Sequence, residues 1–69
     1  MIEQLNFQSE IAGAVQGVTA VFRYYGSRNI ELDEVYLKGR PIDLEALEDR
    51  EIQTIFSHIR NHKLLAAAI

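Results

Sequence analysis

The sequence predicts an α+β fold in which two helices flank a small antiparallel hairpin or sheet, with an all-α helical hairpin as the alternative. Three observations predict it. Apolar residues recur at helical spacing over residues 9–25, they alternate with charged residues over 30–42, and a capped amphipathic pattern runs from residue 44 into the 60s. The chain has 69 residues and shows no linker or internal repeat, so residues 1–69 are expected to form a single domain.

The first predicted helix covers residues 9–25. Ser9 can cap its start, and Gly26 can take the left-handed conformation that ends it. Gly13 and Gly17 each cost about 1 kcal/mol relative to alanine in a helix interior, and we interpret them as small residues that let a second backbone approach. The apolar residues of this segment follow one another at spacings of 4, 3, 4 and 3, as in a coiled-coil seam: Ile11, Val15, Val18, Phe22 and Tyr25. Such a seam would pack either on the second helix of the same chain or on another chain, and both interpretations stay open.

Residues 30–42 read as extended structure. Ile30 and Leu32 alternate with acidic residues, and the Lys38-Gly39 pair suits a tight turn. Pro41 confines the returning strand to a sheet edge, because proline has no main-chain N–H to donate. Leu5 and Phe7 also alternate with polar residues, so the N-terminus could add a further strand.

The second predicted helix begins after Asp43, which is a good N-cap, and Ile42 and Leu47 are placed for a hydrophobic staple. One residue contradicts a continuous helix, because Glu48 would project from the apolar face. We therefore favour a break near Glu48, after which the helix restarts with Asp49 as its cap.

Composition excludes several classes of protein. There is no cysteine, which removes disulfides and thiolate chemistry. Ten acidic residues against seven basic ones give a net charge of −3, which argues against nucleic-acid binding. The longest uncharged stretch, of 12 residues from Ile11 to Phe22, is too short to span a bilayer. With no signal-peptide pattern at the start, we expect a cytoplasmic protein without membrane contact.

A domain this small has difficulty burying enough apolar surface by itself, and association is one remedy. We therefore predict a non-enzymatic protein-interaction module, such as an inhibitor, adaptor or assembly factor. It would act as a homodimer or higher oligomer, with another protein as a further partner, and the 9–25 seam would form the interface. No catalytic or cofactor motif is present, so neither catalysis nor a cofactor is expected.

The alternative function is an oligomeric binder of a nucleotide-like phosphorylated ligand. Arginine forks suit phosphates and aromatic faces stack on bases, which marks one set of candidate residues: Arg23, Tyr24, Arg28, Lys38 and Arg40. His58 and His62 stand four apart and could face one metal ion. Two ligands do not complete a site, so we predict no metal.

Overall fold

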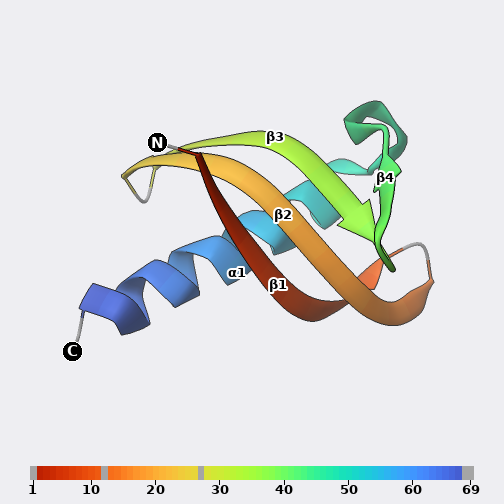
Figure 1. Ribbon diagram of the computed structural model, residues 1–69, viewed down its shortest axis with the longest axis horizontal. Coiled ribbons are helices and arrows are strands. Elements are labelled where there is room, and N and C mark those ends of the chain that lie inside the picture. Colours follow the sequence, from red (N-terminus) through yellow and green to blue (C-terminus); the bar gives the residue numbers. More distant parts are fainter. Residues whose placement is uncertain (1, 12, 27, 68–69) are drawn as a thin grey trace.

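The computed structural model describes residues 2–11, 13–26 and 28–67, which form an antiparallel sheet followed by one long helix (Figure 1). The four strands lie in the order β1-β2-β3-β4, so each pairs with its neighbour in sequence. The elements are β1 (Ile2–Ile11), β2 (Ala14–Gly26), β3 (Asn29–Leu37), β4 (Arg40–Ile42), the short 3₁₀ helix η1 (Leu44–Ala46) and α1 (Asp49–Ala67).

The predicted fold class is wrong. Residues 9–25 were expected to form a helix, but their described part belongs to the end of β1 and to β2, which pair as a hairpin. Neither two helices around a hairpin nor an all-α hairpin describes the molecule. The extended segment over residues 30–42 is confirmed, as is a strand containing Leu5 and Phe7.

The composition of β2 explains why it is a strand. The segment is rich in β-branched and aromatic residues, which fit a pleated surface better than a helix. Its inward positions repeat every two residues through Val18, Ala20 and Phe22. Gly13, at the β1–β2 turn, has φ +82°, a left-handed conformation that glycine adopts without steric cost. The glycine that looked like a helix-packing residue therefore makes a turn between strands.

The core lies between one face of the sheet and α1. The described hydrophobic residues that are buried come from β1, β2, β3 and α1: Ile11, Val18, Ala20, Phe22, Val35, Ile55 and Ile59. Partly buried leucines from η1 and from the link to α1 pack beside them. Because burial stabilises by about 0.8 kcal/mol per methylene, these few side chains supply much of the stability of the fold.

The predicted break in the second helix is confirmed. Asp43 caps η1, where its carboxylate accepts a hydrogen bond from the Glu45 N–H at 3.0 Å. The chain is then extended at Leu47, and α1 starts at Asp49. The predicted cap of the restarted helix was Asp49, but Glu48 stands at the capping position.

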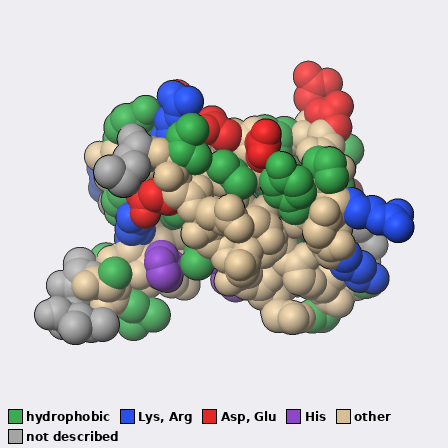
Figure 2. Space-filling view, viewed as in Figure 1, with side chains coloured by type: hydrophobic (Ala, Val, Ile, Leu, Met, Phe, Trp, Pro, Cys, Tyr) green, Lys and Arg blue, Asp and Glu red, His purple; other side chains and the backbone are tan. Residues whose placement is uncertain are grey.

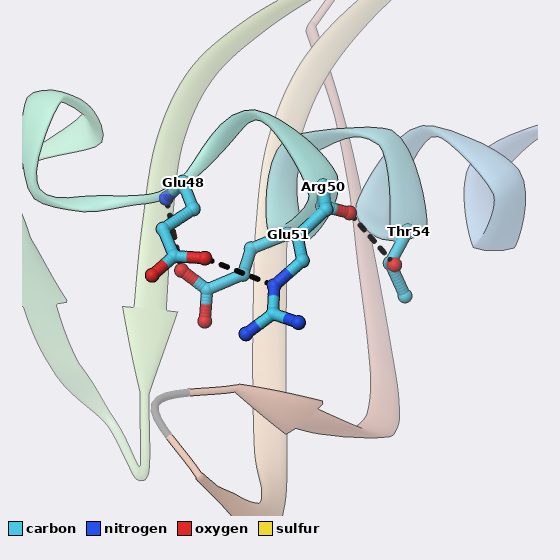
Figure 3. A network of polar contacts seen from close by, with 4 residues as sticks. All are labelled: Glu48, Arg50, Glu51 and Thr54. Atoms are coloured by element: carbon cyan, nitrogen blue, oxygen red, sulfur yellow. Dashed lines mark hydrogen bonds and ion pairs between the residues drawn. The ribbon is translucent and has the colours of Figure 1, made fainter.

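The Glu51 side chain caps the start of α1 (Figure 3). The Glu51 carboxylate accepts from the Glu48 N–H at 2.9 Å, while the Glu48 carbonyl accepts from the N–H groups of Glu51 and Ile52. The bond from the Glu48 N–H to the Glu51 side chain is one half of a capping box. The bonds to the Glu48 carbonyl are the first main-chain bonds of the helix. Arg50 adds an exposed ion pair to the Glu48 carboxylate at 2.9 Å.

Helix α1 crosses behind the sheet at an angle to β1 (Figure 1). The His58 ring stacks on Phe7 with centroids 4.3 Å apart, and further along the helix Lys63 pairs with Glu3. The Lys63 ammonium also lies 5.1 Å from the centre of the Tyr24 ring. The last turns project past the sheet (Figure 1), where Leu64 and Leu65 are 64% and 70% exposed. Among the described residues, no helix is long and apolar enough to cross a membrane.

Candidate interaction surfaces

One face of the sheet is not covered by α1, and we call it the open face. Cross-strand pairs on it include Gln4 with Val21, Asn6 with Thr19, and Thr19 with Tyr36. Uncharged polar side chains and backbone occupy its middle, and hydrophobic and acidic side chains lie along its upper border in the view of Figure 2. The Thr19 hydroxyl donates to the Asn6 side-chain oxygen at 2.7 Å, so even the central polar groups are tied to one another.

The open face is hollowed where it lacks side chains. One shallow hollow is bordered by Asn6, Gly17 and Lys38, and an adjoining one by Gln4 and Tyr36. They share Thr19 and Gly39, so they form one continuous depression. The depression is shallow and open to solvent. This shape suits contact with another macromolecule better than enclosure of a small molecule.

Charged groups gather on β2 and β3 of the open face. Arg23 lies 3.3 Å from an Asp33 oxygen, and its guanidinium pKa is raised, first by a hydrogen bond with the Tyr25 side chain and then by the Asp33 charge. The Tyr36 hydroxyl donates to Glu34 at 2.8 Å. That hydrogen bond, together with the Glu34 charge, raises the pKa of Tyr36.

The outer edge of β1 is the second candidate surface. In the sheet order β1 is terminal, and no described strand lies beyond it. The strand pairs with β2 over its whole length without a bulge. Its side chains include neither lysine nor proline, two of the devices with which proteins block edge strands.

Hydrogen-bond alternation identifies the main-chain groups that are free on this edge. The Lys38 N–H donates to the Gly17 carbonyl at 3.0 Å, so the peptide groups of Gly17 point toward β3. Those of the next residue, Val18, therefore point toward β1, where its partner is Phe7. Odd-numbered residues of β1 thus bond to β2, and the even-numbered ones direct N–H and C=O outward: Ile2, Gln4, Asn6, Gln8 and Glu10.

The structure divides the predicted interface seam between two faces. Ile11, Val18 and Phe22 are each 1% exposed within the core of their own chain. Val15 and Tyr25 lie elsewhere and are 68% and 59% exposed. The seam is no continuous stripe because β2 alternates its side chains across the sheet. Three of its five residues are already covered, and Val15 and Tyr25 alone stay candidates for contact with another chain.

The predicted ligand-binding residues do not meet in one place. Arg23 lies on the open face, Arg28 follows at the β2–β3 turn, and Tyr24 packs toward α1. Lys38 lies in the β3–β4 turn and Arg40 begins β4, at the other end of β3. At ~3.3 Å per residue, a strand of this length separates the two groups by more than 20 Å. A shared phosphate site within one chain is excluded by that distance.

The two histidines have separate surroundings. His58 stacks on Phe7, whereas His62 is exposed near the projecting end of α1. The part of the chain that the structure describes contains no group of three or more histidine, cysteine, aspartate or glutamate side chains placed to hold a metal ion.

Comparison of the chain with family models, with curated proteins and with solved structures finds no match. The function must therefore be argued from the surfaces of this chain alone. Sequence reasoning missed the most informative of them, the β1 edge. The alternation through Leu5 and Phe7 predicted a strand, but the terminal place of that strand follows only from the order of the whole sheet.

Proposed function

We propose that this chain is a non-enzymatic protein-interaction module that acts as a homo-oligomer, in the manner of an inhibitor, adaptor or assembly factor. The observation that carries the proposal is the uncovered edge of β1. A bulge-free strand with unpaired N–H and C=O groups is a template for adding another strand, which is a recurrent mode of protein recognition.

The exposed apolar residues support the same proposal. Ile2 is 57% exposed, next to the edge, and Val15 and Tyr25 lie on β2. A single exposed hydrophobic residue is ordinary. Here they accompany an unpaired edge and a hollowed open face, which together offer both main-chain bonds and apolar contact to a partner.

Sedimentation or light scattering over a range of protein concentrations tests self-association. We expect a mass above that of one chain at micromolar concentration, with dissociation on dilution. A folded chain that stays at the mass of one protomer up to millimolar concentration would contradict the homo-oligomer. A cytoplasmic location is part of the same proposal, and cell fractionation tests it.

The nucleotide-like ligand is the weaker candidate, because its residues lie at opposite ends of β3. It would require the β2–β3 turn of one protomer to meet the β3–β4 turn of another. A thermal-shift panel of nucleotides tests it: binding to the folded chain alone would raise Tm by mass action, and we expect no shift.

A further inference from the structure

We propose that the partner at the β1 edge is a second copy of this chain, paired antiparallel through a two-fold axis at Asn6. The inference rests on the proposed function, since it names the surface and register of the self-association. It is argued from three features of β1: its outward main-chain groups, the residues that the pairing brings together, and the contrast with the opposite edge of the sheet.

The first feature is self-complementarity of the main chain. With the axis at Asn6, this residue meets its own copy, Gln4 meets Gln8, and Ile2 meets Glu10. All of these are even-numbered positions whose N–H and C=O groups point outward, so each pair exchanges both main-chain bonds as an antiparallel ladder requires. A shift by one residue would turn core-facing side chains to the open face. A shift by two would leave end residues without partners.

The second feature is the match of side chains. On the face toward α1, Leu5 would lie opposite Phe7 of the second copy, once on each side of the axis. Both side chains are only partly buried in the single chain, so pairing gives them further apolar cover. Neither acid of β1 meets another acid directly: Glu10 faces Ile2, and Glu3, which already pairs with Lys63, faces Ser9. The register therefore places no like charges opposite each other.

The third feature is that the opposite edge of the sheet is blocked. Strand β4 has three residues, and Pro41 pairs with Tyr36 in its middle. By the alternation fixed at Gly17 and Lys38, Pro41 stands at the position of β4 that faces outward, and proline has no N–H to offer there. Pairing through β1 would thus give a sheet that ends in β4 on both sides. A closed dimer is expected, since neither outer edge can recruit a third copy.

Cysteine crosslinking tests the register, because the natural chain contains no cysteine. Asn6→Cys should form a covalent dimer on oxidation, since residues paired across the axis lie ~5.5 Å apart between Cα atoms, within disulfide range. Gln8→Cys is the matched control. In this register it lies four residues from its own copy, or ~13 Å along the strand, and it should not crosslink. Gln4→Cys mixed with Gln8→Cys should crosslink as a heterodimer.

Proline and charge substitutions test whether the edge carries the association. Asn6→Pro removes an outward N–H and no bond to β2, so we expect a folded monomer by circular dichroism and sedimentation. Leu5→Pro removes an inward N–H and should unfold the sheet instead. Gln4→Lys with Gln8→Lys places like charges opposite each other and should weaken the dimer at least ~10-fold at low salt, whereas Gln4→Lys with Gln8→Glu should not.

The outcomes separate this inference from the proposed function. If the natural chain is monomeric at all concentrations, both are overturned. If it associates, but Asn6→Cys fails to crosslink and both Asn6→Pro and the double lysine variant still associate, the β1 pairing is wrong while self-association stands. In that case the exposed leucines at the end of α1 are the alternative interface, and Leu65→Asp should abolish the association.

Discussion

Val15 and Val18 lie three residues apart on β2 and offer the sharpest test of the fold. They are 68% and 1% exposed, respectively. Truncating Val18 to alanine removes two buried carbon groups at about 0.8 kcal/mol each, plus the energy of the cavity left behind, for a total of roughly 2–3 kcal/mol. Truncating Val15 removes groups that already contact water and should change stability by less than about 0.5 kcal/mol.

Thermal and urea unfolding, followed by circular dichroism at one fixed protein concentration, measures the difference. For a chain of this size each 1 kcal/mol shifts Tm by roughly 4–8 °C, so Val18→Ala should lower Tm by roughly 10–20 °C and Val15→Ala by only a few degrees. The concentration is held fixed because the proposed self-association would make Tm depend on it. Equal losses for the two variants would refute the assignment of these residues to opposite faces of a strand. Equal losses would favour instead a helical segment in which Val15 and Val18 are both buried.

Three further perturbations probe local features. Glu34→Gln should bring the raised pKa of Tyr36 back toward its ordinary value, as ultraviolet titration would detect. In the natural chain this bond stabilises the fold below the pKa of an unfolded tyrosine and is lost as pH rises through the raised pKa, so the variant should be less sensitive to alkaline pH. Glu51→Ala removes at least the bond to the Glu48 N–H and should cost about 0.5–2 kcal/mol in urea unfolding; no loss would contradict a capping role for the Glu51 side chain. Gly13→Ala should cost roughly 1–2 kcal/mol, because φ +82° strains any residue with a Cβ; an unchanged midpoint would mean that this turn is formed otherwise.

The failure to predict β2 from the sequence has a physical cause. The strand carries apolar residues on both of its faces, with Val18 and Phe22 on one and Val15 and Tyr25 on the other. A segment with apolar residues on both faces fits a helical spacing as readily as a strand spacing. Two features favoured a strand over a helix. One was the β-branched content, and the other was Gly13, because glycine destabilises a helix interior by about 1 kcal/mol relative to alanine.

Other elements were predicted because their signals are local. Asp43 caps the residues that follow it directly, and the break near Glu48 follows from a charge that would interrupt an apolar face. The Lys38-Gly39 turn likewise depends only on its own residues. The β1 edge is different, because a strand is at an edge only by virtue of the order of the whole sheet. No pattern within residues 2–11 distinguishes an edge strand from a central one.

The two edges of this sheet are built differently, and in the proposed dimer this difference would make self-association specific. A chain that left both edges open would add copies without limit, since every added chain would present a new template. Here Pro41 and the shortness of β4 close one edge, while β1 presents an unbroken row of alternating donors and acceptors. If β1 were merely a strand left uncovered by a small domain, substituting Asn6 with proline would change solubility but no defined assembly. If the outward N–H and C=O groups of β1 form an interface, the same substitution removes the Asn6 N–H at the two-fold axis and should convert a dimer into a monomer.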